Sequence, residues 1–495
     1  MMATWPLLAL VVGCAFATIS AGRWQVSLAA WLAPAFLLAF SRSQDMPVAL
    51  AGIYIALFVA AAVSNRSIMP LRGGAYVATI AVQTVIGLLP FALDRLLVAE
   101  LPGFAATLFF PAAWTATEFA GARLNPFGTW GSVAYTQYGN LPFMQLASVT
   151  GLWGITFTMT WFGSIASWAV LRGLESPEVF AGVTVYAVVF GVLMLGGSLR
   201  LLLRRTVGPG VRVAAIEPTG HRVDQGELMA ILASAQSPGG DRGAGRRTLE
   251  TLHDLLLATS EREILAGAAI VVWPEAGAPV FAEDEAALLE RAGALARDHG
   301  IHLLLGIATL HAGPPFRLEN RSVLIDPSGE PAFSYRKARP VPGWEAQVSL
   351  RGDGRLPVLA SRSGRLATAI CFDLDFPALL RQAGRGRADL LLAPASDWPQ
   401  IGNTHHAMAS FRAVENGMSM VRAARWGVSA IVDPLGRILA ITDHRSPGAD
   451  AAVAFVQVKG MRTVYARVGD TFAWLCVTLT GGAVSWGALI AAGIV

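Results

Sequence analysis

Lysine is almost absent from this 495-residue chain. Of its 38 basic residues only Lys337 and Lys459 are lysine, which leaves 36 arginines. A lysine ammonium is compact, whereas an arginine guanidinium is broad and planar. Chance is one explanation for the retained lysine at 337. The other is that position 337 needs a compact cation.

Charge of either sign is also scarce. Charged residues make up 15% of the chain and hydrophobic residues 54%, and the mean hydropathy is +0.50. A soluble globular domain carries about 25% charged residues, so this composition indicates a membrane protein. The net charge of +4 comes without a dense basic run, which argues against nucleic acid as a partner.

Cysteine is the third scarcity, with three in the chain. Cys14 and Cys476 lie in long apolar segments, so Cys371 is alone in the polar part of the sequence. This excludes a disulfide framework there, and it also excludes a cysteine-based metal site. His405 and His406 are adjacent and lack a third ligand at helical spacing, so they do not predict a metal site either.

Long apolar runs account for the ends of the chain. About twenty apolar residues span a bilayer. The first run lacks a basic flank and another run follows at once, which favours a retained helix over a signal peptide. We predict a seven-helix transmembrane domain over residues 1–205 and a C-terminal transmembrane helix over 469–495. The eight predicted spans are 4–20, 24–40, 47–64, 75–93, 104–121, 148–171, 179–199 and 472–494.

The intervening residues 206–468 have a different pattern. Short runs rich in Val, Ile and Leu alternate with amphipathic helical patterns, which predicts an α/β domain with sheets buried on both faces. The predicted strands are 211–218, 268–275, 302–310, 321–327, 365–372, 388–396, 418–424, 428–434 and 452–458. The predicted helices are 246–264, 283–299, 377–384 and 404–416.

Three chemically suitable residues stand at predicted strand ends. Glu275 ends "IVVWPE", Lys337 ends "FSYRK" and Cys371 ends "ATAIC". Together they offer a base, a cation and a nucleophile, and the loops at strand ends often build active sites in α/β folds. Asp373 and Asp375 follow the cysteine, and nearby carboxylates raise a thiol's pKa. We therefore expect Lys337 to supply the activating cation. Taken singly, each residue also fits a structural role: a buried thiol, a solvated loop carboxylate and an edge charge.

The motifs around these residues resemble a known superfamily. "VVWPEAG", "SYRKARPVPGWE" and "AICFDLDFP" are similar to the Glu–Lys–Cys motifs of the nitrilase (carbon–nitrogen hydrolase) superfamily. The resemblance implies an αββα sandwich over about residues 210–460. With about eight membrane helices around that domain, the chain resembles the apolipoprotein N-acyltransferase family. The membrane part carries residues in that family's order: Trp114, Glu118, Trp130, Tyr135, Gln137 and Gln145.

The resemblance implies roles for individual residues. Cys371 would be the nucleophile, Glu275 the general base and acid, and Lys337 the stabiliser of the thiolate and the oxyanion. Among supporting residues, Glu345 matches the family's second glutamate, and the N–H of Phe372 would join the oxyanion hole. Asp373 stands where the family usually has glutamate, so it would be a supporting carboxylate.

The implied reaction is an acyl transfer in two steps. An acyl chain would move from a phospholipid to a cysteine thioester, and then to the N-terminal α-amine of a diacylglyceryl-cysteine lipoprotein. The resemblance implies no metal or organic cofactor, and we expect a monomer. The alternative function is a membrane-anchored amidase or nitrilase that hydrolyses a small amide.

The predicted orientation conflicts with one sequence rule, and Glu118 has two explanations. The resemblance implies the bacterial inner membrane with the catalytic domain outside the cytoplasm. The cytoplasmic side would then carry Arg42, Arg95 and Arg172, and the positive-inside rule prefers the opposite orientation. The other side would carry Arg23, Arg66, Arg72, Arg123, Arg200, Arg204 and Arg205. Glu118 lies inside an apolar span, where an ionisable residue indicates either a function or an internal hydrogen-bond network.

Overall fold

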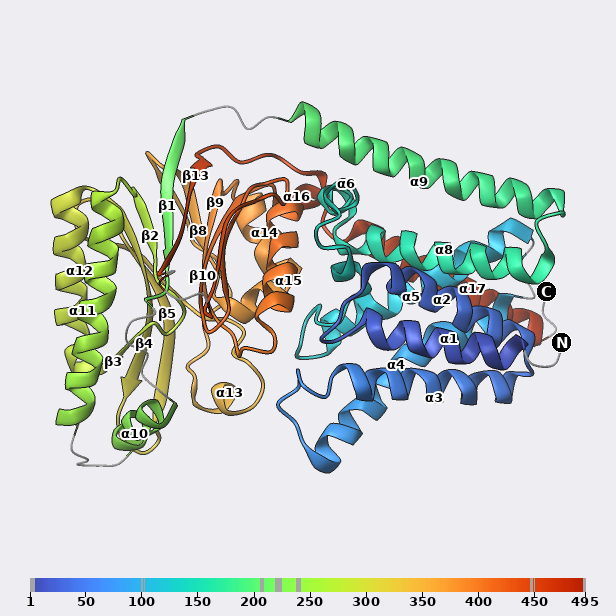
Figure 1. The fold of residues 1–495 in the computed structure, drawn as a ribbon, viewed down its shortest axis with the longest axis horizontal. Coiled ribbons are helices and arrows are strands. Elements are labelled where there is room, and N and C mark those ends of the chain that lie inside the picture. The colour runs from blue at the N-terminus through green and yellow to red at the C-terminus, as the bar shows by residue number, and fades with distance from the viewer. Residues whose placement is uncertain are drawn as a thin grey trace. The chain divides into compact units, whose positions relative to one another are not determined.

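The computed structural model describes residues 5–98, 101, 103–204, 209–218, 225–236, 242–445, 448 and 450–492. The chain divides into two compact units (Figure 1). The helical unit comprises Met1–Arg204 and Val468–Val495, and the sandwich unit comprises Arg205–Arg467.

The helical unit consists of long apolar helices. They are α1 (Trp5–Ser20), α2 (Ser27–Ser43), α3 (Met46–Ser64), α4 (Gly73–Leu97), α5 (Gly103–Leu124), α8 (Leu152–Arg172), α9 (Pro177–Leu203) and α17 (Thr471–Ala491). Between α5 and α8 the chain forms three short turns of helix: η2 (Val133–Gln137), α6 (Leu141–Met144) and α7 (Ala147–Thr150).

Five of these helices, among the residues that the structure describes, are long and apolar enough to cross a membrane: α3, α4, α8, α9 and α17. Helices α1 and α2 are apolar but shorter, with 16 and 17 residues. Large apolar side chains also point outward, and Phe180, Val192 and Leu202 are each more than 60% exposed. Such a surface is stable in lipid rather than in water. The chain is thus a membrane protein, and its eight spans stay a prediction.

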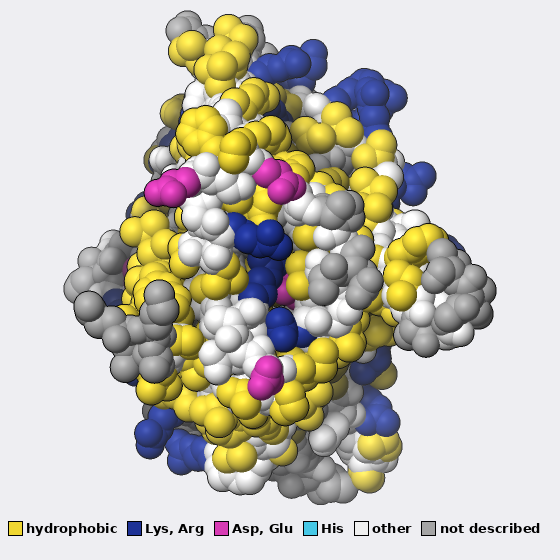
Figure 2. All heavy atoms as spheres, turned by 90° about the vertical axis from the view of Figure 1, so that its right-hand side faces the viewer, with side chains coloured by type: hydrophobic (Ala, Val, Ile, Leu, Met, Phe, Trp, Pro, Cys, Tyr) yellow, Lys and Arg dark blue, Asp and Glu magenta, His cyan; other side chains and the backbone are white. Residues whose placement is uncertain are grey.

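A buried ion pair connects helices inside the helical unit. Arg42 on α2 donates from Nε and Nη2 to the two carboxylate oxygens of Asp94 on α4, at 2.9 and 2.7 Å. Arg42 Nη2 also donates to Ser164 Oγ on α8, at 3.1 Å. This buried pair ties three helices together. On the surface, Figure 2 shows basic side chains gathered near the centre of the face that it draws.

A second pair fixes the start of α17. Asp470, which precedes the helix, accepts hydrogen bonds from Arg123 Nη2 at 2.8 Å and from Trp153 Nε1 at 2.9 Å. The last helix is thereby anchored to α5 and α8, although more than 300 residues separate it from them in the chain.

The sandwich unit contains two β-sheets. The first has the strand order β13-β1-β2-β4-β5-β6, with β3 paired to β4. Its strands are β1 (Gly210–Ile216), β2 (Ile270–Val272), β3 (Ala278–Phe281), β4 (His302–His311), β5 (Arg317–Ile325), β6 (Pro331–Arg336) and β13 (Ala451–Gln457). The second sheet has the order β12-β11-β10-β9-β8-β7. Its strands are β7 (Val358–Ser361), β8 (Gly364–Thr368), β9 (Leu390–Ser396), β10 (Ser419–Arg425), β11 (Val428–Val432) and β12 (Ile438–Asp443).

Alternate side chains of the central strands face two different cores. Val213 of β1 and Leu392 of β9 belong to the core between the sheets, whereas Ala214 of β1 belongs to the core under the outer helices. Helices α11 (Gly243–Leu265) and α12 (Glu285–His299) cover the first sheet (Figure 1). Helices α14 (Pro377–Arg385) and α15 (Gly402–Asn416) cover the second. The predicted α/β sandwich, with strands buried on both faces, is confirmed.

The predicted strand ranges omit four strands: β3, β6, β7 and β12. β6 enters the prediction only through its end, "FSYRK", which places Lys337. β3 and β7 are only four residues long, too short to show a pattern. β12 is an edge strand with exposed and half-buried residues throughout, so it lacks the continuous apolar run of a buried strand. The remaining helices of the unit are α10 (Gln225–Gln236), α13 (Trp344–Val348) and α16 (Val464–Val468), with the short turns η3 (Ala282–Asp284) and η4 (Cys371–Asp375).

Candidate active site

A lysine and two glutamates form the centre of the site. Lys337, which directly follows β6, donates from Nζ to Glu275 Oε1 at 2.7 Å. It also donates to both carboxylate oxygens of Glu345 on α13, at 2.9 and 3.1 Å. Only 3% of the lysine side chain is exposed. Burial alone would lower the pKa of Lys337, but the two glutamates raise it well above its ordinary value, so it is an ammonium ion.

Glu275 is held from several directions. It follows β2 by three residues, and its backbone N–H donates to the carbonyl of Ala395 at 3.2 Å. Its Oε1 accepts a hydrogen bond from Asn320 Nδ2 on β5 at 2.6 Å, and the same nitrogen lies 3.2 Å from Glu345 Oε1. A side chain on Gly306 of β4 would collide with the backbone of Pro274. β4 therefore needs glycine at position 306, because only glycine lets the loop that carries Glu275 pass so close to the strand.

Asn320 and Gly306 were missed by sequence reasoning. Asn320 is a buried polar residue within the strand β5. A polar residue in a strand is the sequence signal that could have identified it. Buried polar groups in strands are hydrogen-bonded, and a partner among the catalytic residues is one explanation. Gly306 gave no comparable signal, because close backbone approach is visible only in three dimensions.

Cys371 occupies an unusual backbone conformation. The predicted strand over 365–372 is too long: β8 ends at Thr368, and Cys371 begins the turn η4. Its φ is 48°, in the left-handed region that an extended strand cannot contain. Non-glycine residues held there store about 1–3 kcal/mol of strain and cluster at functional sites. The Sγ atom donates to the carbonyl of Ser396, at the end of β9, at 3.5 Å.

The resting thiol of Cys371 is protonated. Burial and the nearby Glu275 carboxylate raise its pKa to about 11, against the opposite effects of His405 and Lys337. A thiol is a weak nucleophile until it loses its proton. The site therefore needs a base at the moment of attack, and Glu275 is a carboxylate close enough to influence this thiol.

Asp373 joins the turn η4, which begins at Cys371, to the loop that contains Lys337, here called the lysine loop. Its Oδ2 accepts hydrogen bonds from Tyr335 Oη at 2.9 Å and from the Ile370 N–H at 3.1 Å. Its Oδ1 accepts one from the Arg339 N–H at 2.8 Å. Burial raises the pKa of Asp373 to about 6, although Lys337 lowers it. These contacts agree with a supporting carboxylate that fixes the two loops relative to each other.

Phe372 directly follows the nucleophile. Its side chain is 7% exposed, and its ring lies edge-on to that of Phe376 with 5.4 Å between centroids. This packing holds the turn η4 in place. The use of its N–H as an oxyanion donor stays a prediction.

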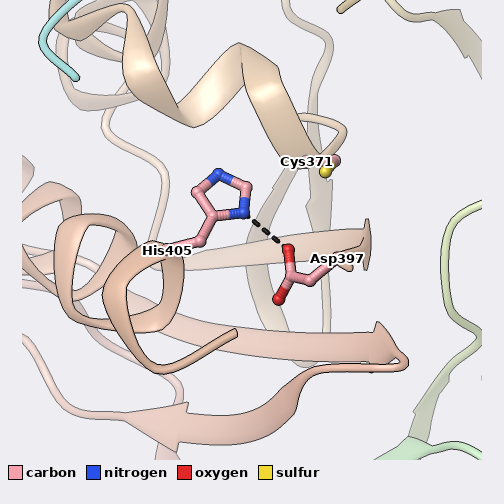
Figure 3. Close-up of side chains that lie close together, drawn as sticks. All are labelled: Cys371, Asp397 and His405. Atoms are coloured by element: carbon pink, nitrogen blue, oxygen red, sulfur yellow. Dashed lines mark hydrogen bonds and ion pairs between the residues drawn. The ribbon is translucent and has the colours of Figure 1, made fainter. Parts of the chain in front are cut away.

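One group within the described parts of the chain has the spacing of metal ligands. Donor atoms of Cys371, Asp397 and His405 all lie within 4.8 Å of one another (Figure 3). However, His405 Nδ1 is 2.7 Å from Asp397 Oδ1, and His405 Nε2 is 3.2 Å from Asp375 Oδ1. A histidine that ligates a metal must offer an unprotonated nitrogen. Carboxylates on both ring nitrogens favour the doubly protonated ring, so this group is better described as an ion-pair network.

Glu118 in the helical unit is fully hydrogen-bonded. Its carboxylate accepts bonds from Trp114 Nε1 at 3.1 Å, Ser132 Oγ at 2.8 Å, the Val133 N–H at 3.1 Å and Thr156 Oγ1 at 3.0 Å. The donors come from α5, from α8 and from the start of η2 with the residue before it. Of the two explanations for an ionisable residue in an apolar span, these contacts favour the internal hydrogen-bond network.

Comparison with known proteins finds a matching family model for each of the two units. A family model described as the N-terminal domain of apolipoprotein N-acyltransferase matches residues 8–165, and one described as carbon-nitrogen hydrolase matches residues 231–465. The chain is 28% identical to an apolipoprotein N-acyltransferase of Geobacter metallireducens, over 76% of this chain and 73% of the relative. It is also 28% identical to the protein of that name from Bradyrhizobium diazoefficiens, over 81% and 76%.

Solved structures similar to this chain include an amidase from Nesterenkonia sp. The TM-score is 0.42 at 23% sequence identity, and the match covers 54% of this chain and 95% of the amidase.

Proposed function

Because the chain belongs to the apolipoprotein N-acyltransferase family, we propose that it moves an acyl chain from a phospholipid to the α-amine of a diacylglyceryl-cysteine lipoprotein. The chain is a membrane N-acyltransferase, and the proposal concerns its substrates and the residues that act. The observation that carries the proposal is the buried ammonium of Lys337 between Glu275 and Glu345, in a site that also holds the Cys371 thiol.

The first step is acylation of the enzyme. The proton of Cys371 passes to the Glu275 carboxylate as Sγ attacks the ester carbonyl of the phospholipid. Negative charge develops on the carbonyl oxygen, where the Lys337 ammonium and the Phe372 N–H stabilise it. The C–O bond then breaks, Glu275 returns the proton to the leaving oxygen, and a lysophospholipid departs. The acyl chain remains on Cys371 as a thioester.

The second step transfers the acyl chain to nitrogen. The neutral α-amine of the lipoprotein attacks the thioester carbonyl, and Glu275 accepts the proton that the amine loses. The C–S bond breaks, the proton returns to Cys371, and an amide is formed. A thioester reacts readily with amines. It survives between the steps because water is largely excluded: Glu275, Lys337 and Cys371 are each 5% exposed or less.

We further propose that the chain lies in the bacterial inner membrane with the sandwich unit outside the cytoplasm. The positive-inside rule argues for the opposite orientation. However, some of the arginines concerned have structural partners, which gives another reason for their placement. Arg123 is paired with Asp470, and Arg200 Nη1 donates to Gln145 Oε1 at 2.7 Å. A C-terminal fusion to a reporter that is active only in the periplasm should stay inactive, and an active fusion would overturn this orientation.

The test of the function separates transfer from hydrolysis. Purified full-length protein in detergent receives a phospholipid with a tagged acyl chain. The tag should stay on the protein until a diacylglyceryl-cysteine peptide is added, and should then appear on the peptide's α-amine. An N-acetylated peptide is the matched control and should accept nothing.

Two outcomes would overturn the proposal. One is the release of free fatty acid at the same rate with and without peptide. The other is turnover of small amides alone, which would support the membrane-anchored amidase instead.

A further inference from the structure

A second set of charged groups reaches Cys371. Asp375, Asp397, His405 and Arg422 are each 3% exposed or less, and we call them the buried charge cluster. They come from separate parts of the sandwich unit. Asp375 ends η4, Asp397 follows β9, His405 is on α15 and Arg422 is on β10. The mechanism above uses none of them.

His405 is at the centre of this cluster. Its Nδ1 lies 2.7 Å from Asp397 Oδ1 and its Nε2 lies 3.2 Å from Asp375 Oδ1. Arg422 Nη2 donates to both oxygens of Asp397, at 2.9 and 2.8 Å. Burial alone would lower the pKa of His405, but Asp375 and Asp397 raise it well above its ordinary value. The carboxylates at both ring nitrogens therefore favour the protonated, positively charged ring, although Arg422 Nη2 also lies 3.2 Å from Nδ1.

This charge acts on the nucleophile. The nearest donor atoms of His405 and Cys371 lie within 4.8 Å of each other, and Figure 3 shows the imidazole and the thiol on neighbouring elements. A hydrogen bond from His405 and its charge both lower the pKa of Cys371. The same ring pairs with Asp375, one of the two carboxylates that follow the cysteine in sequence.

We propose that His405 is a positioning residue for the acyl transfer: it is a second fixed cation beside Cys371, in addition to Lys337, and it offsets the charge of Asp375. This inference deepens the proposed function and rests on it for the identity of the reaction. His405 does not serve as the base, because both of its nitrogens already hold protons. The thiol proton still passes to Glu275, and His405 stabilises the sulfur anion that this transfer leaves behind.

His405 acts together with the other charged groups of the site. They are Glu275 after β2, Lys337 after β6, Glu345 on α13, Asp373 on η4, Asp397 after β9 and Arg422 on β10. His406 is the neighbour of His405 on α15, and burial lowers its pKa to about 3, so it is neutral. It provides a matched control of the same residue type on the same helix.

The test measures the thiol without any acyl donor. Full-length protein in detergent is treated with iodoacetamide across a pH series, and modification of Cys371 is followed by peptide mass spectrometry. His405→Gln removes the cation that pairs with Asp375 and lowers the pKa of the thiol, so it should slow the modification at pH 8 by about tenfold or more. His406→Gln should leave the rate unchanged, because that ring is neutral.

Two further variants keep the test decisive if His405→Gln folds poorly. Asp375→Asn alone removes a negative charge and should speed the modification. Asp375→Asn combined with His405→Gln removes one charge of each sign and should bring the rate back to within about threefold of wild type. A purely structural role for His405 would not be reversed in this way.

An unchanged rate in His405→Gln, or no recovery in the double variant, overturns the proposal. The result is independent of the substrate assays. If wild type transfers no acyl chain but His405→Gln slows alkylation, the proposed function fails while the role of His405 beside the thiol stands.

Discussion

Lys337 and Glu275 form an ion pair of 2.7 Å between Nζ and Oε1, and both side chains are shielded from solvent. The pair has a chemical purpose beyond stability, because each charge is a reagent in the proposed reaction. Its geometry also gives the scarce lysine a reason. One small cation contacts Glu275 and Glu345 at once.

Lys337→Arg should therefore be nearly as damaging as Lys337→Ala. The guanidinium cannot occupy the volume of an ammonium between two carboxylates. Losing one donor to an oxyanion typically costs about 100- to 1,000-fold in rate, and we expect a loss of that order in the peptide acylation assay. The control is Lys459→Arg at the chain's other lysine, which is exposed and should keep wild-type turnover. An arginine at 337 with near wild-type turnover would contradict the role given to Lys337.

Cys371→Ser should form no acyl-enzyme. A serine hydroxyl is much harder to deprotonate than a thiol, and the site already holds even the thiol protonated at rest. After incubation with a labelled phospholipid, wild type should carry a hydroxylamine-sensitive acyl group and the variant none. Cys476→Ser, at a buried thiol of the helical unit, is the control and should label like wild type. Equal labelling of Cys371→Ser would place the nucleophile elsewhere.

Tyr335→Phe should destabilise the sandwich unit by about 1–3 kcal/mol, because a buried carboxylate loses one of its donors. The hydroxyl that is removed lies 2.9 Å from Asp373 Oδ2. Asp373 also holds the Arg339 N–H, so acyl transfer should fall as the lysine loop loosens. Ser334→Ala, at the exposed neighbouring position, should change the free energy of unfolding by no more than about 0.5 kcal/mol. Thermal unfolding in detergent compares the two, and equal midpoints would show that the tyrosine hydroxyl contributes nothing.

The buried charge cluster should make stability depend on pH in a defined window. Although burial alone would raise it, Arg422 and His405 lower the pKa of Asp397 to about 2, so its contribution is present above an unfolded-state pKa of about 3.9 and lost as pH falls through about 2. The raised pKa of His405 works in the opposite sense. Its contribution is complete below about pH 6.5 and is lost as pH rises through the raised value.

The difference in thermal midpoint between wild type and His405→Gln should therefore be largest between about pH 4 and 6.5, and smaller at about pH 9. Tryptophan fluorescence during heating gives the midpoints. A difference that grows with rising pH would mean that His405 is neutral in the folded protein.

The sequence predicted some elements closely and for a physical reason. The run 302–310 predicts a strand because Leu and Ile dominate it, and β4 covers His302–His311. The helix predicted over 283–299 corresponds to α12 at Glu285–His299, whose apolar residues recur at helical spacing. β12 could not be found this way, because neither of its faces is fully buried.

The residues of the candidate site also differ in how well the sequence predicts them. Glu275, Lys337 and Glu345 are embedded in motifs, and the structure brings them into contact. In the sequence, His405 is only one of a histidine pair without a third ligand at helical spacing. Its partners Asp375 and Asp397 come from other segments, 30 and 8 residues earlier in the chain, and only the fold shows that they surround the ring.

Because lysine is so scarce, chemical modification of the two lysines can report on the site. Amine-reactive reagents acylate uncharged, accessible amines, and the chain offers two lysines of opposite character: Lys459 is exposed, whereas Lys337 is enclosed by carboxylates. Lys459 therefore serves as an internal standard for reagent exposure. The ratio of modification at the two positions measures how often the enclosure around Lys337 opens. No label has to be engineered into the chain to follow that opening when a lipid is added.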